Sequence, residues 1–247
     1  MSETTSNSGD RPLTVVLVHG AYADSSSWNG VIELLQAKGI QVRAAVNPLR
    51  GISIDSAYVT SFIEQVPGPV LAVGHSYGGA VITNAAANVN NVVGLVFVAA
   101  FAPDEGESLG EVEAASKDSV LGSAQIALQY PAGVGGKTLN EFIVNPVSFR
   151  DAFAADVAAE QTALMAVTQR PVSELAFTER TGAPAWKKLP SWTVVATGDK
   201  AAGTDVIRAQ AERAGATITE VEGSHVIMVS QPQIVAEVIE GAVAKLA

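Results

Sequence analysis

Residues 70–80 read Val-Leu-Ala-Val-Gly-His-Ser-Tyr-Gly-Gly-Ala, and this stretch decides the fold. The apolar run at 70–73 predicts a buried strand, and the small residues after Ser76 predict a helix that follows directly. Between them stands the pattern Gly-x-Ser-x-Gly, in which a strained strand-to-helix turn exposes the serine oxygen at the edge of a sheet. Gly74 and Gly78 suit this turn because a Cβ there would crowd neighbouring backbone. The alternative is a plain glycine-rich turn, or one that cradles a phosphate.

Composition limits the class of protein. The 247 residues are 48% hydrophobic and 16% charged, so the chain can bury one large core. The net charge is −10 and no basic run occurs, which argues against nucleic acid and anionic membrane surfaces as partners. Cysteine is absent, which excludes disulfides, thiolate metal sites and a cysteine nucleophile. We expect no cofactor, no metal, and a monomer or homodimer.

The first residues are polar, and we interpret residues 1–11 as a loose tail rather than a secretory signal. No apolar run reaches the length of a membrane span. The expected location is therefore the cytoplasm.

Strands and helices alternate on both sides of a long interruption. The alternation predicts an α/β fold, a mainly parallel, doubly wound sheet of about six strands. Strands are predicted at 13–18, 40–46, 70–73, 92–100, 192–197 and 216–221, and helices at 28–38, 55–65, 77–87, 205–214 and 232–245.

Residues 104–190 interrupt this pattern. Helical spacing at 111–116 and 149–168, with a short hairpin arm at 137–144, predicts a mostly helical cap insertion, since a structureless loop of this length is implausible. The expected division is a tail at 1–11, a core at 12–103 and 191–247, and a cap at 104–190.

Only three histidines are present, so a general base for Ser76 can be chosen by position. His19 ends the first strand. His75 precedes the serine, and its side chain is expected to point away from the serine oxygen. His225 lies in the loop after the last strand, where it can reach over the sheet edge, and it is the predicted base.

The carboxylate that orients this base is expected between the serine and the histidine, at the end of a strand. Asp199 meets both conditions. Asp205 is the alternative six residues on, and Asp104 with Glu105 form a further one. An oxyanion hole needs two backbone N–H groups, for which we predict Ala21, after the first strand, and Tyr77, after the nucleophile.

Four segments together resemble the α/β-hydrolase superfamily, and within it the branch of small esterases and hydroxynitrile lyases: residues 18–21, 74–79, 196–200 and 223–232. Plant methyl-salicylate esterases and bacterial hydrolases typify this branch. The resemblance covers 12–103 and 191–246, and it implies the α/β-hydrolase fold and supports Asp199 as the acid. The lyases carry Thr at Gly20 and Lys at Val226, so these positions favour an esterase.

A pocket of apolar and aromatic side chains is expected over the serine. Candidates from the core are Tyr22, Trp28, Tyr77 and Phe101, and from the cap Phe142, Phe149, Phe153, Leu164, Met165 and Trp186. Of these we select Tyr22, Trp28, Phe101, Phe142, Met165 and Trp186 as substrate-binding.

The sequence thus predicts a serine hydrolase that cleaves small apolar or aromatic carboxylic esters, or lactones, through an acyl-enzyme. One alternative is a carbon–carbon hydrolase, lyase or perhydrolase with the same triad. Another is a ligand-binding protein on a hydrolase scaffold with little turnover.

Overall fold

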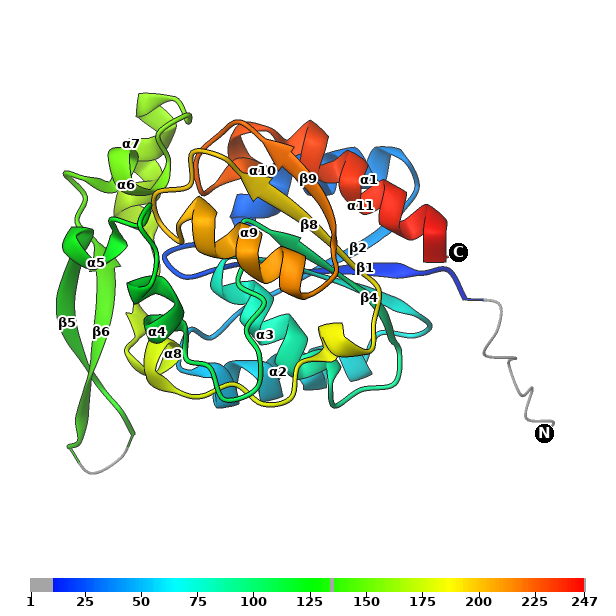
Figure 1. Cartoon of the computed structure of the whole chain (residues 1–247), viewed down its shortest axis with the longest axis horizontal. Helices are drawn as coiled ribbons and strands as arrows, with labels where there is room; N and C mark the ends of the chain where they lie inside the picture. Colours follow the sequence, from blue (N-terminus) through cyan, green and yellow to red (C-terminus); the bar gives the residue numbers. More distant parts are fainter. Residues whose placement is uncertain (1–10, 134–135, 247) are drawn as a thin grey trace.

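The structure, a computed structural model, describes residues 11–133 and 136–246 (Figure 1). The predicted tail lies outside these residues apart from Arg11. Six strands form one sheet in the order β2-β1-β3-β4-β8-β9, and every neighbouring pair is parallel. Their bounds are β1 Thr14–Val18, β2 Gln41–Ala45, β3 Val70–His75, β4 Val92–Val98, β8 Ser191–Ala196 and β9 Thr217–Val221. The predicted α/β fold class is confirmed.

The centre of the sheet forms the core. Every residue of β1 and β3 is buried, as expected for parallel strands covered on both faces. The edge strand β2 buries only Ala45. The apolar runs in the sequence therefore mark the central strands.

Helices cover both faces of the sheet (Figure 1). Helices α1 and α11 pack together on one face, and α2 and α3 on the other. The core helices are η1 Ser25–Trp28, α1 Asn29–Ala37, α2 Ile52–Glu64, α3 Tyr77–Ala86, α9 Thr204–Arg213, α10 Ile227–Ser230 and α11 Pro232–Leu246. Sequence patterns did not indicate α10, and α2 begins three residues before its predicted start. Among the described residues, no helix is long and apolar enough to cross a membrane.

The chain between β4 and β8 forms the cap. It holds helices, although the segment predicted at 149–168 is divided into two of them, and it also holds an antiparallel sheet in the order β5-β6-β7. The predicted arm at 137–144 is β6, and its partner β5 was not indicated by the sequence. The hairpin of β5 and β6 projects from the body (Figure 1). The elements are α4 Leu109–Ala114, α5 Leu121–Ala124, β5 Gln125–Pro131, β6 Thr138–Val144, α6 Phe149–Phe153, α7 Ala159–Thr168, β7 Val172–Ser173, α8 Leu175–Thr178 and η2 Ala185–Lys187.

Candidate active site

Ser76 lies at the turn between β3 and α3, with φ 52° and ψ −124°. This positive φ is strained for a residue with a side chain. The turn is also tightly packed. A Cβ on Gly74 would meet the Gly78 carbonyl oxygen at 2.5 Å, and a Cβ on Gly78 would meet the Val18 carbonyl oxygen at 2.5 Å. The two glycines are therefore required by close backbone approach, as the motif predicts.

The imidazole of His225 is paired with Asp199. The distance from His225 Nδ1 to Asp199 Oδ2 is 2.8 Å, and both side chains are 1% exposed. The second carboxylate oxygen, Oδ1, accepts the N–H groups of Ala201 at 2.9 Å and Ala202 at 3.0 Å. Because a carboxylate oxygen accepts here, Nδ1 is the donor of this hydrogen bond, and Nε2 is the ring nitrogen left to accept a proton.

The other two histidines are buried and held in hydrogen bonds. His75 Nε2 lies 3.0 Å from the His225 carbonyl oxygen, and the two rings are 4.7 Å apart at their centroids. Burial, reinforced by the nearby His225, holds the pKa of His75 well below its usual value. His19 Nδ1 donates to Gly20 O at 2.9 Å and Nε2 accepts from Asn47 N–H at 3.0 Å. Burial lowers the pKa of His19 to about 4, so both rings are neutral near pH 7.

The two predicted oxyanion donors lie beside the serine turn. Tyr77 is the first residue of α3, where a backbone N–H has no acceptor within the helix. Ala21 follows Gly20, and a Cβ on Gly20 would meet Ser76 Cβ at 2.7 Å. Within the described residues neither N–H donates to another group. The Tyr77 side chain turns into the core, where its hydroxyl donates to Asp55 Oδ2 at 2.7 Å.

Aromatic side chains of the cap close over the imidazole. The Phe153 ring lies 5.0 Å from the His225 ring and 5.9 Å from the Tyr22 ring, centroid to centroid. The Phe149 ring packs against the Phe153 ring, with 5.1 Å between their centroids. On the core side, Trp28 packs edge-on against His75 at 6.4 Å. The structure thus brings Tyr22 to the site, and adds Phe153 from the wider set of candidates.

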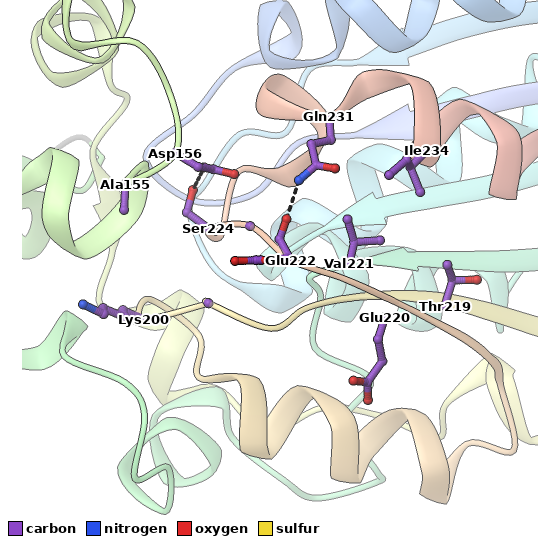
Figure 2. A pocket seen from close by; sticks show the side chains of 12 residues that line it. Ala155, Asp156, Lys200, Thr219, Glu220, Val221, Glu222, Ser224, Gln231 and Ile234 are labelled. Carbon is purple, nitrogen blue, oxygen red and sulfur yellow. Dashed lines mark hydrogen bonds between the residues drawn. The ribbon is translucent and has the colours of Figure 1, made fainter.

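Two cavities flank this arrangement, and Ser76 lines neither. One of about 370 Å³ lies between η1, α7 and α10, and its wall includes Tyr22, Met165 and Met228. The other, of about 820 Å³, is an open depression at the loop before His225 (Figure 2). In it the cap residue Asp156 accepts a hydrogen bond from the Ser224 hydroxyl, a link that the sequence did not indicate.

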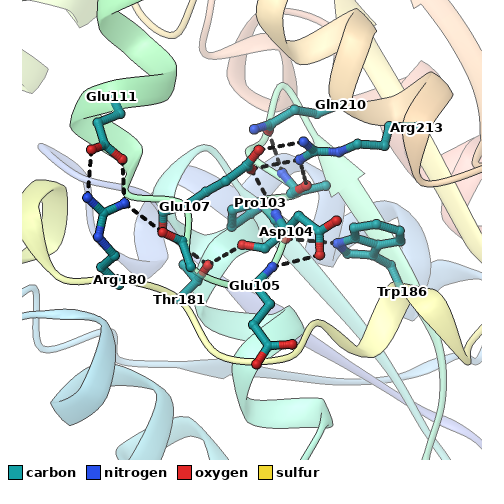
Figure 3. Close-up of polar contacts among 12 residues, drawn as sticks. Pro103, Asp104, Glu105, Glu107, Glu111, Arg180, Thr181, Trp186, Gln210 and Arg213 are labelled. Carbon is teal, nitrogen blue, oxygen red and sulfur yellow. Dashed lines mark hydrogen bonds and ion pairs between the residues drawn. The ribbon is translucent and has the colours of Figure 1, made fainter.

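Polar contacts fasten the cap where the chain leaves the core and returns to it (Figure 3). Arg213 of α9 donates to both carboxylate oxygens of Glu107, at 2.5 and 2.8 Å. The Trp186 indole N–H donates to Pro103 O at 3.0 Å. Trp186 was predicted to bind substrate, but its indole instead forms part of this junction between the cap and the core. Asp104 pairs there with Lys187.

The remaining predicted residues are distributed as follows. Asp205 accepts from the Ser116 hydroxyl and from Lys117 N–H, so the carboxyl paired with His225 is Asp199 and not this alternative. Phe101 is buried and its N–H donates to Ser76 O at 3.2 Å. Phe142 packs against Phe177 at 6.3 Å, and Leu164 is exposed.

One ionisable residue near the site was not found from the sequence. Glu113 of α4 is partly buried, and burial raises its pKa to about 7. It interacts electrostatically with His225 and Asp199, as well as with Tyr22. No motif marks a glutamate on a short helix, so only the packing of the cap reveals it. In the described parts of the chain, no group of three or more His, Cys, Asp or Glu side chains could hold a metal ion.

Comparisons with known proteins agree with this fold. Residues 15–238 match the alpha/beta hydrolase family. No curated protein sequence matches the chain. Among solved structures, polyneuridine aldehyde esterase superposes with a TM-score of 0.79 at 21% identity, covering 94% of this chain and 100% of that one. A methylesterase from Arabidopsis gives 0.77 at 19% identity, covering 95% and 100%. Tomato methylketone synthase I complexed with 2-tridecanone gives 0.76 at 20%, covering 96% and 100%. At these identities the likeness concerns the fold.

Proposed function

The chain belongs to the alpha/beta hydrolase family, and on this premise we propose that it hydrolyses small carboxylic esters with Ser76 as the nucleophile. His225 is the general base and Asp199 orients it. The N–H groups of Ala21 and Tyr77 bind the oxyanion.

In the first half-reaction, Ser76 Oγ attacks the ester carbonyl carbon while His225 Nε2 takes the serine proton. The carbonyl oxygen becomes an oxyanion that accepts the two N–H groups. The C–O bond to the alcohol then breaks, and the alcohol leaves with the proton from His225. In the second half-reaction, water gives a proton to His225 while its oxygen attacks the acyl carbon. The bond from that carbon to Ser76 Oγ then breaks, Ser76 Oγ takes the proton back from His225, and the acid leaves.

One observation carries this proposal: His225 forms a buried pair with Asp199, 2.8 Å apart, and its carbonyl oxygen lies 3.0 Å from Nε2 of His75, the residue before the serine on the strained turn. A carboxylate at Nδ1 makes Nε2 the basic nitrogen and stabilises the imidazolium that forms. The names of two neighbouring structures, an esterase and a methylesterase, support an ester as the substrate.

The surroundings of His225 support an apolar or aromatic ester. Phe153 and Phe149 close over the imidazole, and Tyr22 packs against Phe153. Val226, the residue after the base, is fully buried and apolar. A hydroxynitrile lyase of the resembling branch carries lysine there, so this position argues against cyanohydrin cleavage.

A second candidate function is cleavage of a carbon–carbon bond next to a ketone, by the same residues. The similarity to methylketone synthase, which was solved with a ketone bound, supports including it. A panel of p-nitrophenyl esters, lactones and β-keto acids separates the two functions by their products.

The decisive test is Ser76→Ala. We expect it to lower kcat on a p-nitrophenyl ester by about 10⁴-fold or more. A fluorophosphonate probe should label the wild type at Ser76 and leave the variant unlabelled. Ser123→Ala, on the exposed face of α5, is the control and should behave as wild type. Unchanged turnover by Ser76→Ala would overturn the proposal, and a wild type that neither turns over esters nor reacts with the probe would indicate a binding protein.

A further inference from the structure

The side chain of His75 joins the serine turn to the backbone of His225. His75 Nε2 lies 3.0 Å from the His225 carbonyl oxygen, and because a carbonyl oxygen only accepts, Nε2–H is the donor. Among the residues that the structure describes, no backbone N–H donates to this oxygen. The two rings are also in contact, with 4.7 Å between their centroids. His75 ends β3 and directly precedes Ser76, so this contact links the nucleophile's turn to the proposed base.

His225 is therefore held both at its ring and at its backbone. Its ring Nδ1 lies 2.8 Å from Asp199 Oδ2, and its carbonyl oxygen accepts the hydrogen bond from His75. The ring nitrogen left for the serine proton is Nε2. A general base must lie within hydrogen-bond reach of the proton that it takes, and a displacement of about 1 Å can cost roughly 10²-fold in rate. The backbone contact can therefore matter for the rate as well as for the fold.

An imidazole at position 75 is costly for the fold. The side chain is fully buried, and the Trp28 ring packs edge-on against it at 6.4 Å. Its Nδ1 has no hydrogen-bond partner in the described parts of the chain, and a Cβ on Gly20 would lie only 2.9 Å from it. A buried polar atom without a partner costs free energy that an apolar side chain would avoid. What histidine supplies here, and an apolar side chain does not, is the donor at Nε2.

We propose that His75 is a positioning residue for the reaction, because its Nε2–H holds the backbone of His225 and so keeps the imidazole of the base in place for Ser76. His75 itself takes no part in proton transfer, since its remaining ring nitrogen is turned to the backbone of Gly20. The expected loss of rate rests on the proposed function, whereas the positions of the ring protons can be measured without any turnover.

The first measurement needs only the wild type. An NMR spectrum of the chain labelled at the histidine ring nitrogens, recorded at about pH 9, shows which nitrogen of each neutral ring carries the proton. His19 donates from Nδ1 to Gly20 O, and His225 donates from Nδ1 to Asp199. We therefore expect two rings protonated at Nδ1 and one, His75, protonated at Nε2. A proton on Nδ1 of His75 would exclude the hydrogen bond to His225 and overturn the inference.

The second measurement is the split between kcat and KM on a p-nitrophenyl ester. His75→Met removes the donor and keeps a side chain of similar length, whereas His75→Gln keeps an N–H group at a similar distance from the backbone. We expect His75→Met to lower kcat about 10- to 100-fold, with KM changed less than about twofold, and His75→Gln to stay within about threefold of the wild type. Leu71→Ala, at a fully buried position of the same strand, is the control, and it should lower the melting temperature without lowering kcat.

Three kinetic results would contradict the positioning role. These are an unchanged kcat in His75→Met, an equal loss in His75→Gln, or an equal loss in Leu71→Ala, which would assign the effect to lower stability. If the wild type does not cleave esters, the Nδ1–H resonance of His225 replaces kcat. It should broaden through faster exchange with water in His75→Met and stay sharp in Leu71→Ala. The proposed function would then fail while the positioning of His225 by His75 stands, and a resonance that stays sharp in His75→Met would refute that as well.

Discussion

Strands β1 and β3 bury every one of their residues, whereas β5 in the cap leaves most of its residues exposed. The core is therefore held by apolar burial on both faces of a sheet. The cap packs buried apolar side chains such as Phe149 and Phe153 against this core. Polar contacts add to that attachment, among them Gln125 to the Tyr22 hydroxyl and Arg170 Nη1 to Asn47 O at 3.1 Å.

The residues of the proposed site therefore depend on two different parts of the structure. The nucleophile, base and acid stand on turns whose shape follows from the core strands. The cap adds Phe153, whose position depends on its contacts with Tyr22, Phe149 and His225. A change in the core should therefore alter the fold, whereas a change in the cap should alter electrostatics and pocket shape. Three measurements test this contrast, beginning with the largest expected effect.

A methyl group added at the serine turn should be far more disruptive than one added in the cap. In Gly78→Ala the new Cβ would lie 2.5 Å from Val18 O and 2.9 Å from His19 O, so β1 and α3 must separate. We expect a loss of about 3 kcal/mol or more in the free energy of unfolding, measured by chemical denaturation.

Gly122→Ala is the matched change in the cap. Its Cβ would meet nothing within 4 Å, and it lies in α5. We expect a change of about 1 kcal/mol or less, in the stabilising direction, because alanine favours a helix. Equal losses in the two variants would contradict the contrast between core and cap.

The second prediction concerns Glu113 in the cap. Its pKa in the folded chain, about 7, is raised above the ordinary value of 4.5. The folded chain therefore favours the protonated carboxyl. The contribution of Glu113 to the free energy of unfolding is fully present below pH 4.5 and is lost as the pH rises through 7. Glu113→Gln should match the wild type at pH 4 and exceed it at pH 8 by about 1 kcal/mol, allowing for partial exposure, or roughly 2–4 °C in Tm.

Stability is expected to depend on pH in the opposite direction through His19, in the core. Its pKa is lowered by burial from 6.5 to about 4, so its contribution is present above pH 6.5 and lost as the pH falls through 4. Melting curves of wild type and Glu113→Gln between pH 4 and 9 should share the acid loss, and the difference between them should grow as the pH rises from 4.5 through 7. A Glu113→Gln variant no more stable than wild type at pH 8 would show that this carboxylate costs the fold nothing.

The smallest change in stability is expected for the ion pair of Arg213 and Glu107, at the junction between the cap and the core. The Arg213 and Glu107 side chains are 36% and 31% exposed, and ion pairs of this kind contribute about 0–1 kcal/mol. Glu107→Gln should lower stability by less than about 1 kcal/mol, and the difference should shrink in 1 M salt. Glu220→Gln, which breaks the exposed pair with Arg208 between α9 and β9, is the control within the core. A loss of stability much larger than about 1 kcal/mol for Glu107→Gln would mean that polar contacts at this junction, and not apolar packing, hold the cap on the core.

Features that depend on neighbouring residues in the chain were predictable from the sequence. The apolar runs marked the central strands because both faces of a parallel sheet are buried. Gly74, Ser76 and Gly78 marked the strained turn because only glycine allows its backbone contacts. With three histidines in the chain, position alone selected His225 as the candidate base.

Features that depend on distant residues were decided by the tertiary structure. Asp199, Asp205 and Asp104 all stood at plausible places, and only the fold brings one of them to His225 and pairs the others elsewhere. The cap sheet and the position of Phe153 follow from contacts between segments far apart in sequence. Local patterns carry no trace of such contacts, because the same helix or glutamate would fit many positions until packing selects one.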